Sequence, residues 1–183
     1  MTQQRRRIAY PSPTEYGECY RSYVQRIGPE ESILPCLRQG AREMTDLLRQ
    51  IPAEGWSLRY APGKWDIRTL VLHLIDGERV FAYRALRIAR GDSTPLPGFD
   101  ENAFAAECGA HLRSPASLLT EYRAVRRTTL LLFQSLPPHT LGRVGTASGH
   151  PASPRAIAHI IAGHERHHLA SLRKRYLPLL RTS

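Results

Sequence analysis

Apolar side chains recur along most of the chain at spacings of three, four and seven residues, which is typical of helices with one buried face. The strongest of these segments run from about Glu31 to Ile51, Asp66 to Arg90, Ser114 to Leu136 and Ser153 to Tyr176. No segment shows a convincing alternation of apolar and polar residues between turn signals, which a half-buried strand would need. The pattern therefore predicts an all-α protein.

The ends of these segments carry residues that begin and end helices. Asp66, Ser114 and Ser153 are good N-caps, and a proline directly follows each of the two serines. Pro52 ends the first segment, and Gly91 is a good stop for the second. These boundaries indicate four separate long helices.

Two connections are longer than a minimal antiparallel link. The stretch 93–104 is rich in proline, with at most a short helix after it, and 142–151 is a glycine-rich polar loop. A shorter helix is expected around Tyr16 to Arg26. Four amphipathic helices with polar connections predict a four-helix bundle, and the long connections mean that its topology need not be simple up-down-up-down.

The length of 183 residues, with 42% hydrophobic and 23% charged residues, suits one domain with a sizeable core. We predict a basic, flexible N-terminal arm over 1–14, a single bundle domain over 15–177 and a C-terminal tail over 178–183. No apolar run approaches the roughly 18 residues needed to cross a bilayer. The basic N-terminus lacks the apolar stretch of a secretory signal, so the expected location is the cytoplasm.

The net charge of +10 lies mainly at the two ends of the chain. The basic residues there are Arg5, Arg6, Arg7, Arg173, Lys174, Arg175 and Arg181. Without them the net charge falls to +3. Because both ends are predicted to fray, the excess does not form a defined recognition face for nucleic acid.

The three cysteines, Cys19, Cys36 and Cys108, are far apart and form no CxxC pair. This spacing argues against a disulfide framework and against a cysteine zinc site. We expect the three to behave as small buried apolar residues.

Histidines gather on the fourth predicted helix. Because a helix turns by about 100° per residue, His164 and His168 fall in the middle of its apolar stripe, His167 on the flank of that stripe and His159 on the opposite face. Two imidazoles one turn apart can bind one ion. The remaining histidines, His111, His139 and His150, are expected to face solvent.

A complete metal site needs a further ligand from a facing helix. His73 is the best candidate, because it shares a face of the second predicted helix with Leu70, Gly77 and Val80. Spacing alone leaves two interpretations equally open. The histidines hold a divalent metal, or they form a hydrogen-bonded cluster in the core or in a wet interface.

At these residues the sequence resembles the DinB superfamily, which includes YfiT-like and bacillithiol-transferase-like proteins. The matching segments are Tyr60–Asp92 with its PGKW motif, Thr94–Phe104, and Ser153–Leu177 with its GHERHH motif. Together with the helix pattern, the resemblance covers most of residues 15 to 177.

The resemblance implies a four-helix bundle with a crossed topology, often as a homodimer. It also implies a divalent metal, commonly zinc or nickel, held by histidines that correspond to His73, His164 and His168. Characterised relatives include bacillithiol-dependent S-transferases and mycothiol-dependent isomerases, and many members have no assigned reaction.

Three neutral imidazoles would leave positions on the ion open, as in catalytic sites. We therefore expect a metal-dependent enzyme acting on a small molecule, either a thiol S-transferase that uses a low-molecular-weight thiol or a hydrolase. A non-catalytic metal-binding module for stress response or ligand binding ranks second. A nucleic-acid binder ranks third, because no recognition motif accompanies the charge.

Several neighbours of the histidines are candidates for supporting roles. Asp76, Glu78 and Glu165 could orient the imidazoles, with a solvated surface position as the alternative for each. Arg84 could attract an anionic substrate, although a surface ion pair is the expected role. Trp65 is expected to pack at the helix start as a hydrophobic staple.

Overall fold

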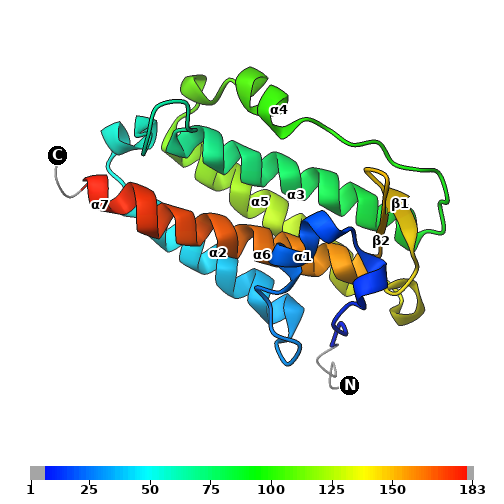
Figure 1. Ribbon diagram of the computed structural model, residues 1–183. Helices are drawn as coiled ribbons and strands as arrows, with labels where there is room; N and C mark the ends of the chain where they lie inside the picture. The colour runs from blue at the N-terminus through cyan, green and yellow to red at the C-terminus, as the bar shows by residue number, and fades with distance from the viewer. Residues whose placement is uncertain (1–6, 181–183) are drawn as a thin grey trace.

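The computed structural model describes residues 7–180, and within them four long helices form the bundle (Figure 1). They are α2 (Ile33–Arg49), α3 (Ile67–Ala89), α5 (Pro115–Ser135) and α6 (Pro154–Ser171). The last helix continues through a π-helical turn, Leu172–Tyr176, into α7 (Leu177–Leu180). The side chains of Asp66, Ser114 and Ser153 cap their helices as predicted.

The bundle has the crossed topology that the long connections allow. Figure 1 shows α3 and α5 running in one direction, and α2 and α6 running in the other. Among the four long helices, the main contacts join α3 to α5 and α6, and α2 to α5 and α6. Consecutive helices α2 and α3 therefore lie on a diagonal, as do α5 and α6. The predicted all-α bundle with a non-simple topology is confirmed.

Short elements fill the connections. They are α1 (Arg21–Val24), α4 (Glu101–Glu107), β1 (Gly145–Ala147), β2 (His150–Ala152) and the 3-10 turns Pro13–Glu15, Glu18–Tyr20, Ala53–Ser57, Ala110–Leu112 and Pro138–Thr140. The loop prediction for 142–151 missed the antiparallel pair β1–β2, whose turn has positive φ at Ser148 and Gly149. Strands of three residues are too short for a period of two to be visible in the sequence.

A polar layer divides the apolar core into two clusters, one toward each end of the bundle. Each long helix has small or polar residues at this level. They are Gly40 on α2, Gly77 and Glu78 on α3, Arg126 and Thr129 on α5, and Gly163, His164 and Glu165 on α6. The layer places functional groups in the middle of the bundle, away from its ends.

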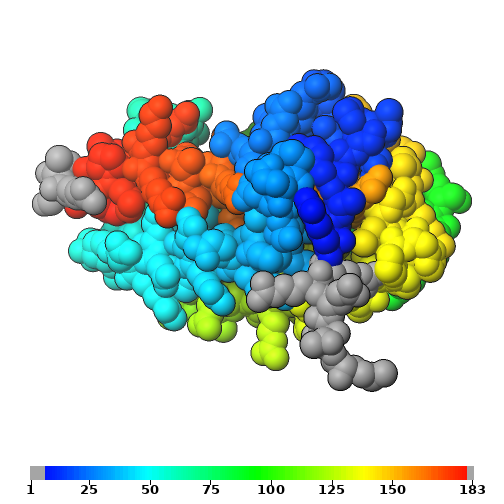
Figure 2. All heavy atoms as spheres, turned by 90° about the horizontal axis from the view of Figure 1, so that it is seen from below, coloured from blue at the N-terminus to red at the C-terminus, as the bar shows by residue number. Residues whose placement is uncertain are grey.

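The N-terminal segment packs against the bundle from Arg7 onward, and residues 1–6 lie outside the described part. Ile8 is 2% exposed, and the Arg7 guanidinium donates to the Pro29 carbonyl. In Figure 2 the blue N-terminal residues lie against α6 and the hairpin. Over its described residues, the segment predicted as a flexible arm is thus part of the packed domain, because Ile8 joins the core.

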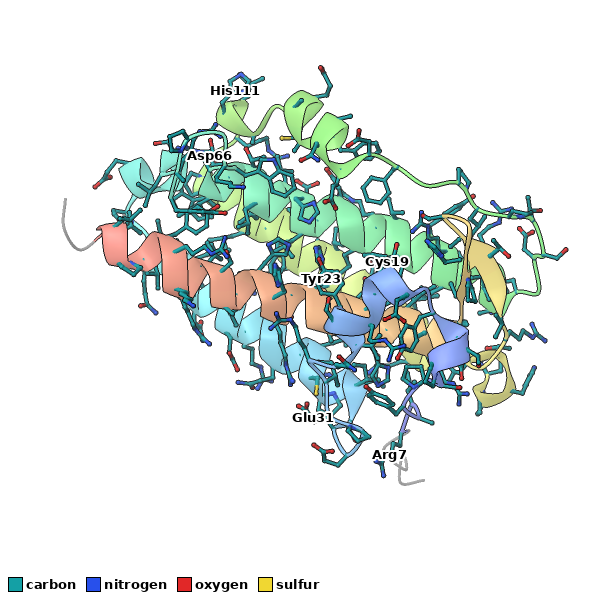
Figure 3. All side chains as sticks on the ribbon, in the orientation of Figure 1. Arg7, Cys19, Tyr23, Glu31, Asp66 and His111 are labelled. Atoms are coloured by element: carbon teal, nitrogen blue, oxygen red, sulfur yellow. The ribbon has the colours of Figure 1, made fainter. Side chains whose placement is uncertain are left out.

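The cysteine prediction is wrong in part. All three cysteines are free, but Cys19 is exposed in its short turn (Figure 3), and Cys36 and Cys108 are half-buried. No helix among the described residues is long and apolar enough to span a membrane.

Candidate metal centre

His73 of α3 and His164 and His168 of α6 meet in the polar layer, and we call them the histidine trio. Nε2 of His164 lies 2.9 Å from Nε2 of His73 and 3.0 Å from Nε2 of His168. The spacing of four residues places both α6 imidazoles on one helix face. The structure therefore brings together the three histidines that the sequence singles out, with their ligand atoms all within 4.8 Å of one another.

Two glycines lie close to the trio, and the packing requires a glycine only at position 163. The His164 ring lies over Gly77, whose added Cβ would stand 3.6 Å from Cε1 of that ring. A Cβ at Gly163 would stand only 1.9 Å from the Tyr23 carbonyl oxygen. Glycine at 163 is therefore required for the close approach of α1, which brings the Tyr23 ring to 5.2 Å from the ring of His164 (Figure 3).

Aromatic rings surround the trio. Trp65 lies 4.8 Å from His73 between ring centroids, and Phe81 lies 6.3 Å from His164. Trp65 thus contacts the predicted metal ligand itself, a role beyond the expected helix staple. This environment excludes water from several sides of the trio and lowers the local dielectric constant.

Burial keeps the imidazoles neutral. It lowers the pKa of His73 to about 4 and, together with the neighbouring His73, the pKa of His168 to about 3. Burial also holds the pKa of His164 well below its usual value. Neutral imidazole is the form that binds metal, so the trio is ready to ligate at neutral pH.

The contacts among the Nε2 atoms cannot all be ordinary hydrogen bonds. A neutral imidazole nitrogen carries either one hydrogen or one lone pair. Yet Nε2 of His164 faces two partners at hydrogen-bond distance. A cation bound by all three nitrogens would resolve this conflict, and tetrahedral zinc holds imidazole nitrogens about 3.3 Å apart, given Zn–N bonds of about 2.0–2.1 Å. The three imidazole donors thus fit a divalent metal, and the two Nε2 separations from His164 lie close to the zinc value.

A family model for the DinB superfamily matches residues 37–172. This chain belongs to the DinB superfamily. A protein of Oceanobacillus iheyensis, provisionally named as a metal-dependent hydrolase, is 32% identical over 129 residues, which cover 66% of this chain and 69% of that protein. The predicted family membership is confirmed.

The bundle also resembles a solved structure. YfiT from Bacillus subtilis, described as a probable metal-dependent hydrolase with an unusual four-helix bundle topology, matches with a TM-score of 0.74 at 14% identity. The match covers 82% of this chain and 87% of YfiT. At this identity the likeness establishes the fold of the DinB chain. Its chemistry has to be inferred from its own residues.

None of the three predicted supporting acids bonds to the trio within the described residues of this DinB protein. Asp76 is half-buried on α3, and Arg79 pairs with it at 3.5 Å. Glu78 and Glu165 are buried, but each projects to another side of its helix, because every residue step turns the helix by about 100°. The prediction that these acids orient the imidazoles finds no contact to support it.

Glu78 and Glu165 instead join Arg126 and Tyr122 in a second buried group, which we call the carboxylate–arginine cluster. The Arg126 guanidinium donates to both Glu78 oxygens at 2.8 Å and to Glu165 at 2.9 Å. The Tyr122 hydroxyl also donates to Glu165. Burial raises the pKa of Glu165, and the guanidinium opposes that shift.

Arg84 is buried, not in a surface ion pair as expected. It is 3% exposed, and its guanidinium donates to the Pro97 carbonyl and the Ser148 hydroxyl, both at 2.8 Å. It therefore ties the long connection and the β1–β2 hairpin to α3.

His159, which the sequence places on the face of its helix opposite to the apolar stripe, is also buried. Its ring is 1% exposed because Tyr10 of the N-terminal segment covers it, and its Nδ1 lies 2.7 Å from the Arg155 carbonyl. His111, His139 and His150 are exposed, as predicted.

A cavity of about 430 Å³ reaches the trio at His168. Trp65 and His167 form part of its wall, and Asn102 of α4 lines it from the connection above. This volume is in the range of small-molecule sites. The cavity escaped the sequence analysis because its wall comes from segments far apart in the chain.

Proposed function

We propose that this chain is a metal-dependent enzyme that acts on a small molecule at the histidine trio. The observation that carries the proposal is the convergence of three neutral Nε2 atoms beside an open cavity. His73, His164 and His168 would hold one divalent ion, with Zn²⁺ or Ni²⁺ as the proposed identity. When bound, such an ion acts as a Lewis acid that lowers the pKa of a water or thiol ligand.

Side chains of this protein shield one side of the trio from water and leave another side open to a substrate. Tyr23, Trp65 and Phe81 cover the imidazoles and exclude water. The cavity leaves His168 reachable for a substrate. Hydrolysis is the first candidate reaction, since both named relatives are described as metal-dependent hydrolases.

Thiol S-transfer is the second candidate, and one observation favours it. Among the described residues, no Asp or Glu lines the cavity, and outside the trio His167 is the imidazole there that could take a proton from an attacking water. A low-molecular-weight thiol is more acidic than water and therefore depends less on such a base. The proposal also includes the homodimer that the family resemblance implies and a cytoplasmic location.

The deciding experiment measures metal content by elemental analysis of untagged protein. The natural chain is compared with a variant carrying His73→Ala, His164→Ala and His168→Ala. The matched control carries His111→Ala, His139→Ala and His150→Ala, which removes three exposed histidines. We expect about one ion per chain in the natural protein and the control, and none in the trio variant.

Two assays then measure turnover. Hydrolysis is followed with an activated ester as the substrate, and S-transfer is followed with an electrophile together with a thiol. Activity that disappears only in the trio variant supports the enzyme. Metal binding without turnover in either assay would favour the non-catalytic module instead. Natural protein that stays empty after incubation with zinc and nickel would overturn the metal site.

A further inference from the structure

The wall of the cavity beside the trio carries positive charge. Within residues 7–180 four basic residues line it, and we call them the basic rim: Arg26, Lys64, Lys174 and Arg175. No Asp or Glu of this described part belongs to the lining. The cavity therefore presents four cationic groups to a bound molecule and no acidic group among its lining residues.

The fold assembles this rim from three separate segments. Arg26 follows α1, Lys64 belongs to the loop before α3, and Lys174 and Arg175 lie in the π-helical turn after α6. The prediction that Lys174 and Arg175 fray with the C-terminal end is wrong, because they belong to a helical turn packed on the bundle. π-Helical turns occur frequently at functional sites.

The rim cations have no carboxylate partners among the described residues. Arg26 contacts Nδ1 of His167 at 3.3 Å, and Arg175 donates to the Tyr60 hydroxyl at 2.9 Å. Both partners are uncharged groups. The ammonium groups of Lys64 and Lys174 make no hydrogen bond or ion pair within residues 7–180.

Basic residues nearby behave differently. Arg59 pairs with Asp66 at 3.2 Å, and Arg173, next to Lys174 in the chain, pairs with Glu43 at 3.2 Å. Arg166 pairs with Glu31. Acidic partners are thus available in this part of the molecule, yet none faces the cavity.

From this arrangement we infer that the substrate of the trio is a small anion that carries a carboxylate or phosphate group. The anionic group binds at the basic rim through charge-assisted hydrogen bonds, and the reacting group lies toward His168. The inference rests on the proposed function for the reaction at the trio. The preference for an anion rests on the rim alone.

The test measures binding of succinate, inorganic phosphate and neutral butane-1,4-diol. Trp65 lines the cavity, whereas Trp56 is 1% exposed in the core, so tryptophan fluorescence reports on the site. Calorimetry provides an independent reading. Each titration is done on metal-free and on zinc-loaded protein.

The rim variant carries Lys64→Gln, Lys174→Gln and Arg175→Gln. The control carries Arg38→Gln, Arg42→Gln and Arg127→Gln, which removes the same charge from an exposed groove between α2 and α5. We expect the natural chain to bind succinate or phosphate and not the diol. The affinity for the anion should fall at least about tenfold in the rim variant and less than about twofold in the control.

Three results would overturn the inference: equal affinity for the diol, an equal loss in the control, or tight binding of a DNA oligonucleotide that neither anion displaces. Metal content of every variant is measured in parallel. Protein that takes up no zinc but still prefers the anions contradicts the proposed function and leaves the anion-binding cavity standing. Protein that takes up zinc but shows no preference for an anion contradicts the anion-binding cavity and leaves the proposed function standing.

Discussion

The histidine trio and the carboxylate–arginine cluster are two buried polar groups in the same layer of one bundle, and they differ in how far their bonds are satisfied. In the cluster, Arg126 donates to two carboxylates and also to the Leu37 carbonyl at 2.7 Å. The cluster thus links all four long helices. In the trio, Nε2 of His164 faces the Nε2 atoms of His73 and His168 at hydrogen-bond distance, and its single hydrogen or lone pair cannot satisfy both.

Burial alone therefore does not reveal the role of a polar group. A buried network whose members satisfy one another fixes the fold. A buried group whose donors and acceptors do not match, and which borders a cavity, is suited to a ligand. In this bundle the two kinds share α3 and α6, so the cluster also holds the helices that position the trio.

The largest predicted effect on stability comes from a substitution that breaks the carboxylate–arginine cluster. Arg126→Met leaves the carboxylates of Glu78 and Glu165 buried without a cation, and we expect a loss of about 3–5 kcal/mol in the free energy of unfolding. Urea denaturation at neutral pH measures it. The matched control is Arg127→Met, an exposed neighbour on α5, which should cost less than about 0.5 kcal/mol.

Arg126→Lys sharpens the same prediction. Lysine keeps the charge but cannot form the paired contacts of a guanidinium, so an intermediate loss is expected. If Arg126→Met is as stable as Arg127→Met, the cluster does not hold the bundle together, and the proposed contrast with the trio fails.

The next effect concerns the trio. Zinc at about 100 times its dissociation constant should raise the free energy of unfolding of the natural chain by about 2.7 kcal/mol. His164→Ala should abolish this increase, because it removes the central ligand. Urea denaturation with and without zinc gives the difference.

His159→Ala is the matched control for that measurement, since His159 is a buried histidine of the same helix outside the trio. Its own stability is expected to fall, but the increase caused by zinc should persist. An equal increase from zinc in His164→Ala would place the metal elsewhere.

The sequence predicts much of this arrangement because periodicity determines which face of a helix is buried. That information suffices for the four helices and for placing His164 and His168 inward. His73 follows from the same reasoning applied to α3. The glycine at 77 was expected to leave room beside His73, and the structure shows that the neighbouring ring is that of His164.

Periodicity cannot show what covers the other faces. His159 lies off the apolar stripe of α6 but is buried by the N-terminal segment. Arg84 falls on the inward face of α3, and the partners that its guanidinium needs there come from the long connection and the β1–β2 pair. Glu78 and Glu165 look like surface acids until α5 supplies Arg126. The basic rim is assembled from three segments, and no pattern within any one of them reveals it.

The smallest predicted effect tests whether the large contribution of the cluster to the free energy of unfolding comes from its burial or from ion pairing alone. Glu31 and Arg166 form an ion pair with similar chemistry, but their side chains are 31% and 37% exposed. The hydrogen bonds from Arg166 are the main cause that lowers the pKa of Glu31 to about 2. Because the pKa is lower in the folded state, the pair stabilises the protein above the unfolded pKa of 4.5 and loses this contribution as the pH falls through about 2.

Glu31→Gln should therefore cost about 1 kcal/mol at neutral pH, since solvent screens an exposed pair. The difference from the natural chain should shrink as the pH falls from about 5 toward 2. Urea denaturation across that range measures both quantities. If Glu31→Gln lowers the free energy of unfolding as much as Arg126→Met does, ion pairing alone determines the size of the loss. The burial of the cluster in the bundle would then add nothing to its contribution.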